Sequence, residues 1–350
     1  MAAGSRSIDM TDATMEVVVC RQPGDLRIER RPIPRRQGDE ILIRVRHVGV
    51  CGTDMHIFRG TQPYLSYPRI MGHELSGEVV EAPSHSPLRP GDPIYVLPYL
   101  SCGSCFACRN SKPNCCLHLE VLGVHRDGGL AQYVSVAERF VFRAEGITLP
   151  QAAMIEFLAI GAHAVRRSGV QRGQRVLVSG AGPIGIACAL FSQLAGAELT
   201  VLDTRTERLD FCRRWLGVSR TLTAGTDAEL ELSRLTNGEM FDVVIDATGN
   251  ASAMQEGFKF IAHGGTYVLV SVVDSNITFS DPEFHRREAT LMGSRNATAE
   301  DFELVLSEMR AGRIPTEALN THAAALTELP QILATWMDPS AGVIKAIVRC

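Results

Sequence analysis

The chain has 350 residues, of which 45% are hydrophobic and 21% are charged, and its formal net charge is −4 at pH 7. This composition excludes a disordered or fibrous protein, and the length exceeds what one hydrophobic core usually organises, so two domains are expected. The small negative charge gives no general surplus of cations for a phosphate backbone, so nucleic acid is not expected as a partner.

Three further features bear on location. The longest apolar stretch, residues 176–202, is interrupted by Gly, Pro, Ser and Gln, which indicates a buried αβ core and no membrane span. The first 20 residues lack the continuous apolar run of a secretory signal. Half of the ten cysteines lie within residues 102–116, which favours metal binding in a reducing compartment over a disulfide framework. We therefore expect a cytoplasmic protein.

The pattern of apolar and polar residues changes near residue 151. Before it, short apolar alternations such as "EILIRVRHVGV" are broken by Gly and Pro clusters, which predicts a β-rich domain. "LPQAAMIEFLAIGAHAVRRSGV" then has helical spacing. After it, strand-like runs alternate with helical segments, which predicts a parallel sheet with helices on both faces. These runs are "RVLVSG", "ELTVLD", "FDVVIDATG" and "GTYVLVSVV", and the tail "AGVIKAIVRC" again resembles a strand.

A cysteine-rich loop, "CGSCFACRNSKPNCC", carries a C-x2-C-x2-C-x7-C pattern made by Cys102, Cys105, Cys108 and Cys116. Such short intervals let four thiolates converge on one tetrahedral ion, and four thiolates with no open position describe a structural zinc site. Cys115 is an alternative fourth ligand by spacing alone. Buried free thiols, disulfides, an iron–sulfur cluster and a nucleic-acid finger are alternative interpretations of the same cluster.

A dinucleotide signature follows the first strand of the second half. Gly180, Gly182 and Gly185 form a G-x-G-x-x-G pattern between a strand and an apolar helix, and Asp203 ends the next strand about twenty residues later. The glycines let backbone approach a pyrophosphate at the helix N-terminus, and Asp203 is expected to accept the adenosine ribose hydroxyls. The carboxylate favours NAD over NADP, although Arg205 and Arg208 follow closely. The predicted cofactor-binding residues are Gly180, Gly182, Pro183, Ile184, Gly185, Asp203 and Arg208. A glycine-rich turn that binds nothing is the alternative.

A second candidate metal site combines "GVCGTDMH" with "MGHELSGEVVE". Cys51, His73 and Glu74 supply a thiolate, an imidazole and a carboxylate, which is a ligand set for zinc with one position left for water or substrate. Taken singly, such a cysteine or histidine is more often a core residue, but a neighbouring nucleotide fold makes the metal site the better interpretation.

Together, "GVCGTDMH", "GHELSGEVV", the four-cysteine loop and "GAGPIG" resemble the zinc-dependent medium-chain alcohol and polyol dehydrogenases. The resemblance implies an α/β protein in which a GroES-like β-rich catalytic domain is joined to a Rossmann doubly wound parallel-sheet domain. It implies domain limits of 15–157 for the catalytic domain with its structural zinc loop, 158–294 for the NAD-binding domain and 295–350 for the return to the catalytic domain. It also implies two zinc ions per chain and a homodimer or homotetramer.

The resemblance assigns roles to particular residues. It implies that Cys51 and His73 are ligands of the catalytic zinc, and that either Glu74 or Glu156 completes the set. It implies further that Asp54 hydrogen-bonds the ligand histidine. It makes Thr53 and His56 the relay that carries the alcohol proton to solvent while hydride passes to the nicotinamide.

The same resemblance points to a substrate. "SDPEFHRREATLMGSRNATAEDF" is similar to sugar-acid dehydrogenases that oxidise the C5 hydroxyl of L-galactonate, L-gulonate or related aldonates. Arg295 is expected to grip the substrate carboxylate and Asn296 to recognise a hydroxyl. Because Gly52 stands where ethanol-oxidising members often carry a basic cofactor contact, Lys345 or Arg295 is expected to reach the pyrophosphate.

The sequence alone does not exclude several other functions. A sorbitol-like polyol dehydrogenase or an L-threonine dehydrogenase would use the same site, and a non-catalytic NAD-binding zinc protein would use both zinc ions structurally. A zinc-free quinone reductase is disfavoured because it needs neither ligand cluster.

Overall fold

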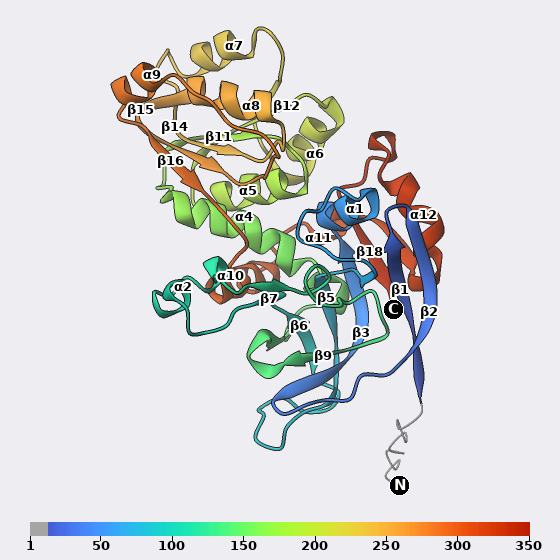
Figure 1. Ribbon diagram of the computed structural model, residues 1–350. Coiled ribbons are helices and arrows are strands. Elements are labelled where there is room, and N and C mark those ends of the chain that lie inside the picture. Colours follow the sequence, from blue (N-terminus) through green and yellow to red (C-terminus); the bar gives the residue numbers. More distant parts are fainter. Residues whose placement is uncertain (1–12) are drawn as a thin grey trace. The chain divides into compact units, whose positions relative to one another are not determined.

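The structure is a computed structural model that describes residues 13–350 (Figure 1). The chain folds into two compact units. Among the described residues, the first unit is formed by residues 13–102, His118–Met154 and Asn320–Cys350, and the second by Gly103–Leu117 and Ile155–Leu319. The stretch considered above for a secretory signal lies in part outside the described residues. Between residues 13 and 350, no helix combines the length and the apolar character needed to cross a membrane.

The first unit is built from mainly antiparallel sheets, in the largest of which the last strand of the chain pairs with a strand from its first fifty residues, while the last two strands run parallel to each other. Its largest sheet has the strand order β10-β6-β5-β3-β18-β17, with β9 also paired to β3. The last strand, β18, runs antiparallel to β3, and Val348 lies opposite Val48. Its strands are β1 (Thr14–Gln22), β2 (Asp25–Pro32), β3 (Glu40–Val50), β4 (Arg69–Ile70), β5 (Glu74–Glu81), β6 (Pro93–Val96), β7 (Tyr99–Leu100), β8 (Glu120–Val121), β9 (Tyr133–Ala137), β10 (Val141–Arg143), β17 (Asn320–Ala325) and β18 (Lys345–Arg349).

The second unit contains a six-stranded parallel sheet in the order β13-β12-β11-β14-β15-β16. Counted within the sheet, this order is 3-2-1-4-5-6, the doubly wound arrangement in which dinucleotides bind where the strand order reverses. That reversal lies between β11 and β14, whose ends pair Ser179 with Asp246. The strands are β11 (Arg175–Ser179), β12 (Glu198–Asp203), β13 (Arg220–Thr223), β14 (Phe241–Asp246), β15 (Ile261–Leu269) and β16 (Thr290–Gly293).

Helices cover this parallel sheet, and Figure 1 draws α4 and α5 on one side of it and α7 and α8 on the other. Because the strands are covered on both faces, they are continuous apolar runs, and Leu177, Val244 and Tyr267 are fully buried in the core. The helices of the second unit are α2 (Phe106–Arg109), α4 (Ile155–Ser168), α5 (Pro183–Leu194), α6 (Thr206–Leu216), α7 (Ala228–Leu235), α8 (Ala251–Glu256), α9 (Asp281–Arg286), α10 (Ala299–Arg310) and α11 (Thr316–Leu319). The first unit has α1 (Gly52–Arg59), α3 (Leu149–Ala152) and α12 (Leu329–Trp336).

The two compact units are held together internally by long-range hydrogen bonds. In the second unit, α10 packs against α4 through Asp301, which accepts hydrogen bonds from His163 and Arg166. The loop Gly103–Leu117 is bonded within the same unit through Asn114. The domain limits 15–157, 158–294 and 295–350 stay a prediction.

Candidate active site

The first metal-binding cluster is assembled where β3 leads into α1. Cys51 follows the last residue of β3 and caps α1, with an extended backbone at φ −106° and ψ 162°. Glu74 is the first residue of β5, the neighbour of β3 in the sheet, and His73 directly precedes it. The sulfur, the imidazole nitrogen and a carboxylate oxygen of these three residues all lie within 4.8 Å of one another. His73 and Glu74 are buried and Cys51 is half-buried, so one side of the cluster remains open.

These three donors fit zinc, which takes thiolate, imidazole and carboxylate ligands and keeps an open position in catalytic sites. The structure therefore brings together Cys51, His73 and Glu74, which the sequence analysis had grouped from two separate motifs. Glu156 lies in the first turn of α4 in the second unit, where it is buried. Its role as a metal ligand stays a prediction.

Asp54 braces the cluster through the backbone. Its carboxylate accepts a hydrogen bond from the N–H of Cys51 at 2.9 Å and another from the N–H of Gly72, beside His73, at 3.1 Å. Burial raises the pKa of Asp54, while the charge of His73 and the two N–H groups act in the opposite direction. A single carboxylate thus fixes the backbone next to two of the ligands. The predicted hydrogen bond to the His73 ring itself stays a prediction.

A buried ion pair completes the cluster, and the sequence analysis missed it. The ammonium nitrogen of Lys345 lies 2.6 and 2.7 Å from the two carboxylate oxygens of Glu74 and 3.2 Å from the carbonyl oxygen of Val50. Both side chains are almost completely buried, with 2% and 0% of their surfaces exposed. Gly49 makes room for the pair, because a Cβ atom there would overlap the Glu74 carboxylate.

This arrangement gives Lys345 a partner that the sequence did not indicate. Its ammonium group is enclosed with Glu74 and neutralises a carboxylate beside the metal cluster. The only sequence signal for this pair was a lysine in an otherwise apolar final strand, "VIKAIV". The expected contact of Lys345 with the pyrophosphate stays a prediction.

The proposed relay residues share one helix. Thr53 and His56 are three residues apart on α1, so they lie on the same face. His56 is exposed, and its Nδ1 atom is 2.9 Å from the hydroxyl of Thr61, a partner that the sequence did not indicate. An exposed imidazole one helical turn from a half-buried hydroxyl is suited to passing a proton to water.

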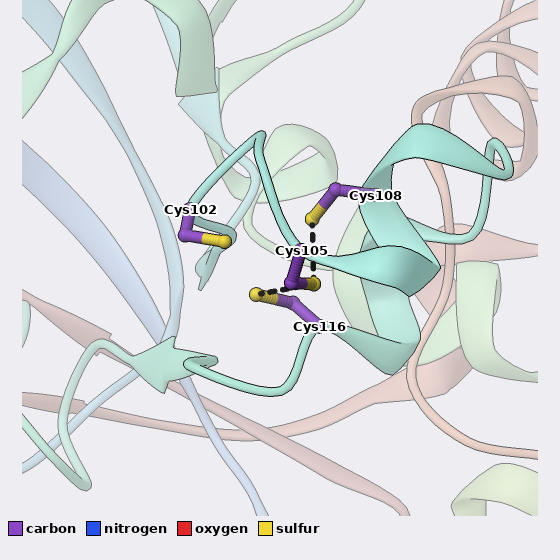
Figure 2. Close-up of side chains that lie close together, drawn as sticks. All are labelled: Cys102, Cys105, Cys108 and Cys116. Atoms are coloured by element: carbon purple, nitrogen blue, oxygen red, sulfur yellow. Dashed lines mark hydrogen bonds between the residues drawn. The ribbon is translucent and has the colours of Figure 1, made fainter.

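The four-cysteine loop gathers its thiols around one point (Figure 2). The sulfur of Cys105 lies 3.5 Å from that of Cys108 and 3.8 Å from that of Cys116, and all four ligand atoms, including that of Cys102, lie within 4.8 Å of one another. A tetrahedron of sulfurs around zinc at about 2.3 Å has edges of about 3.8 Å, so the loop fits one such ion. Cys115 is exposed and is not in the group, which identifies Cys116 as the fourth candidate ligand.

Hydrogen bonds also favour the thiolate form in this loop. The backbone N–H groups of Cys108 and Leu117 point at the sulfur of Cys105 and lower the pKa of its thiol. Deprotonated sulfur is the form that binds a metal ion. Spacing, convergence and thiolate stabilisation agree on a metal-binding loop.

The glycine-rich turn after β11 has the geometry of a phosphate cradle. Gly180 adopts φ +91°, a conformation that disfavours other residues, and a Cβ atom at Gly185 would overlap the carbonyl oxygen of Gly180. Gly182 caps α5 and Pro183 occupies its first turn, so free N–H groups of Ile184 and its neighbours face the space before the helix. An anionic pyrophosphate is the ligand that such a helix N-terminus favours.

Asp203 closes the same turn from β12. Its carboxylate accepts hydrogen bonds from the N–H of Ala181 at 2.5 Å and the N–H of Arg205 at 2.8 Å. Arg208 donates to the carbonyl oxygen of Ala181 at 3.1 Å, and Arg205 is paired with Glu207. These contacts hold Asp203 at the edge of the turn, the position expected of a ribose-binding carboxylate.

Arg295 and Asn296 follow β16. The side chain of Arg295 is exposed and that of Asn296 is half-buried, and Asn296 has a left-handed backbone at φ +54°. The two residues lie in the second unit, and their contact with a substrate stays a prediction.

The fold and the two clusters together define a class: an oxidoreductase that uses a nicotinamide dinucleotide and a metal ion. A model of the alcohol dehydrogenase GroES-like domain matches residues 37–146, and a model of the zinc-binding dehydrogenases matches residues 183–311. The chain belongs to the zinc-type medium-chain alcohol dehydrogenase family. It is therefore an enzyme that uses zinc and a nicotinamide cofactor.

Individual relatives match nearly the whole chain. An L-galactonate-5-dehydrogenase of Escherichia coli (strain K12) is 40% identical over 337 residues, which cover 96% of this chain and 99% of the relative. A 2-dehydro-3-deoxy-L-galactonate 5-dehydrogenase of Pseudoalteromonas atlantica is 29% identical over 317 residues, with coverage of 90% and 92%. The crystal structure of a short chain alcohol dehydrogenase from E. coli CFT073, complexed with NADH, has a TM-score of 0.90 at 27% identity and covers 96% of this chain and 99% of its own.

Proposed function

We propose that the protein oxidises the C5 secondary alcohol of a sugar acid, such as L-galactonate or L-gulonate, to a ketone, with NAD as the hydride acceptor. The observation that carries the proposal is the 40% identity to an L-galactonate-5-dehydrogenase along nearly the full length of both chains. A second sugar-acid dehydrogenase among the relatives supports the same substrate class. The reaction moves the carbinol hydrogen with its electron pair to the nicotinamide ring, releases the hydroxyl proton and leaves a carbonyl group.

Residues of the first cluster would hold the catalytic zinc, whose chemistry is to stabilise an alkoxide at neutral pH. Cys51 and His73 are the two ligands, and Asp54 keeps their backbone in place. The hydroxyl of Thr53 accepts the alcohol proton as it gives up its own, and His56, which is exposed, delivers a proton to water. Replacing Thr53 by Ala should lower kcat by about 100-fold, the usual size of a general acid–base contribution, while NAD binding is retained.

The third protein ligand is Glu74 or Glu156. Both oxygens of Glu74 accept hydrogen bonds from Lys345. If Glu74 binds the zinc ion, one of these oxygens must therefore contact the ion and the ammonium group at the same time. Zinc content and the absorption spectrum of the cobalt-substituted enzyme in Glu74→Gln and Glu156→Gln distinguish the two, because loss of a ligand changes the coordination geometry.

A second zinc ion is proposed for the four-cysteine loop. The sulfur separations of 3.5 and 3.8 Å support it, because they match the edge of a four-thiolate zinc site. This ion has no open position and is structural.

NAD is proposed over NADP. A 2′-phosphate would approach the carboxylate of Asp203, and like charges repel. Arg205 is the nearest guanidinium along the chain, but it is paired with Glu207, and Arg208 is bonded to Ala181. These pairings support the preference for NAD because both guanidinium groups of this turn are bonded within the protein, so neither is reserved for a 2′-phosphate.

A carboxylate on the substrate calls for a cation in the site, and we propose that Arg295 provides it and that Asn296 binds a substrate hydroxyl. The exposed guanidinium of Arg295 supports this role, since it is open to a bidentate pair with a carboxylate. A homodimer or homotetramer in the cytoplasm is also proposed, and light scattering coupled to size-exclusion chromatography measures the oligomeric state.

The function is tested by the absorbance of NADH with zinc-loaded enzyme and L-galactonate, L-gulonate, L-idonate, sorbitol or L-threonine. Selective turnover of an aldonate supports the proposal, and Arg295→Ala should then raise KM for the aldonate far more than for sorbitol. Turnover of sorbitol or threonine alone would keep the chemistry and replace the substrate. No turnover of any of the five would refute the proposed substrate class.

A further inference from the structure

Asn114 connects the metal-binding loop to a distant segment of the second unit. It lies in the single turn Pro113–Cys115, between the candidate ligands Cys108 and Cys116, and only 5% of its surface is exposed. Its side-chain nitrogen is 3.0 Å from the carbonyl oxygen of Arg295 and 3.2 Å from Nε2 of His163. A buried amide inside a loop of ligands is thus bonded to the backbone of a residue 181 positions away.

The hydrogen-bond partners fix the direction of each bond. Asp301 is a carboxylate 2.8 Å from Nδ1 of His163, so Nδ1 carries the proton and Nε2 is left as an acceptor. The two hydrogens of the Asn114 amide then go to His163 and to the carbonyl oxygen of Arg295. This assignment uses both donors, which leaves the amide one orientation.

The far end of this network is firmly anchored. Asp301 is fully buried and accepts further hydrogen bonds from Nε of Arg166 and from the N–H of Thr298, both at 2.8 Å. Burial alone would raise the pKa of Asp301, but the bonds from His163, Arg166 and Thr298 hold it well below its ordinary range. Asp301 is therefore ionised at neutral pH and keeps His163 in the orientation that receives Asn114.

The backbone of Asn114 makes a further contact with the segment that contains Arg295 and Asn296. The side-chain nitrogen of Asn296 is 3.5 Å from the carbonyl oxygen of Asn114, and Asn296 has the positive φ that few residues adopt. The turn at Arg295 and Asn296 is thus held by contacts from the loop at both residues.

We propose that Asn114 is a positioning residue: through it, the loop folded on the four-thiolate ion sets the backbone of Arg295 and Asn296, and with it the selectivity for a carboxylate substrate. The selectivity part rests on the proposed function, because Arg295 and Asn296 are its substrate-binding residues. The zinc ion proposed for the four-cysteine loop, although structural, then contributes to substrate recognition without contacting the substrate.

The test compares Asn114→Ala with Asn110→Ala. Asn110 is the matched control, since it lies in the same loop and its side chain bonds to the neighbouring carbonyl oxygen of Phe106 at 2.8 Å and, among residues 13–350, to no distant segment. Asn114→Ala should raise KM for the aldonate by about fivefold to tenfold, the size of one lost buried hydrogen bond, with KM for NAD unchanged. Its effect should also be smaller in an Arg295→Ala background, because both changes act on the same contact. Asn110→Ala should leave KM for the aldonate at the wild-type value.

Hydrogen–deuterium exchange of the peptide spanning residues 294–299 gives a readout that does not depend on activity. Exchange of this peptide should rise in Asn114→Ala. It should also rise in Cys116→Ser, which should lose one zinc ion per chain. If Arg295→Ala leaves KM unchanged, the substrate role fails, and faster exchange in Asn114→Ala still supports positioning. Unchanged exchange in a folded, zinc-replete Asn114→Ala overturns the inference. If that variant does not fold, Asn114→Ser, whose side chain is too short to reach the Arg295 carbonyl, is measured in its place.

Discussion

Replacing Lys345 by Met tests the buried ion pair beside the metal cluster. The change removes the ammonium group that lies 2.6 and 2.7 Å from the oxygens of Glu74 but keeps an apolar chain of similar length. Glu74 is then a carboxylate with 0% of its side chain exposed and no cation in contact. Removing one partner of such a pair costs about 3 to 5 kcal/mol of unfolding free energy.

The double variant Glu74→Gln/Lys345→Met separates charge from packing. Because it removes both charges, no buried ion is left without its partner, and its stability should return to within about 2 kcal/mol of the wild type. Gln keeps the shape of Glu, so the packing around Gly49 is preserved.

The two tryptophans of the chain make the assay specific to one unit. Trp336 is buried in α12 of the first unit, and Trp215 lies in α6 of the second. Urea unfolding followed by Trp336 fluorescence in a Trp215→Phe background reports the unit that contains the ion pair. A chelator is present throughout, so that no bound cation replaces the ammonium group.

Two results would refute this reasoning. A Lys345→Met variant as stable as the wild type would mean that Glu74 is already neutralised by another group. A double variant less stable than Lys345→Met would mean that the unpaired carboxylate of Glu74 is not what destabilises the single variant.

Three further predictions concern the other sites. Cys105→Ser should lower the zinc content from two ions to one per chain, whereas Cys115→Ser should keep both; equal contents by elemental analysis would contradict the assigned ligands. Burial raises the pKa of Asp246 from 3.8 to about 6, so the unfolded chain binds fewer protons between these values and the second unit should lose about 2 kcal/mol of stability as pH rises from about 4 to 6. Asp246→Asn should abolish that loss in unfolding followed by Trp215 fluorescence, and a slope that survives would exclude Asp246 as its source. Asp203→Ser should lower the ratio of kcat/KM for NAD to that for NADP by about tenfold, and an unchanged ratio would remove Asp203 from cofactor selection.

The sequence identified those parts of the fold that depend on neighbours along the chain. Alternating strands and helices predicted the parallel sheet, because strands covered on both faces must be continuously apolar. The glycine turn between β11 and α5 was predicted because Gly180 and Gly185 occupy positions where a side chain would be strained or would overlap backbone. Four cysteines within fifteen residues predicted a metal loop, because so short a segment has few ways to separate them.

Tertiary structure decided the contacts between residues far apart in the chain. Lys345 meets Glu74 across 271 positions, and Asn114 meets Arg295 across 181. Neither pair leaves a periodic signal, so the partner of Lys345 was not predicted and an asparagine between cysteines was not singled out at all.

The sequence by itself determined the chemistry available to this protein: the thiolates, imidazoles and carboxylates of its metal sites and the glycines of its cofactor turn. Only the tertiary structure decided how those groups are supported. A buried charge must find its partner wherever the fold brings one, so Lys345 had to be located in space before its role beside Glu74 was visible. Local pattern specifies which groups are present, and long-range packing specifies what holds them in place.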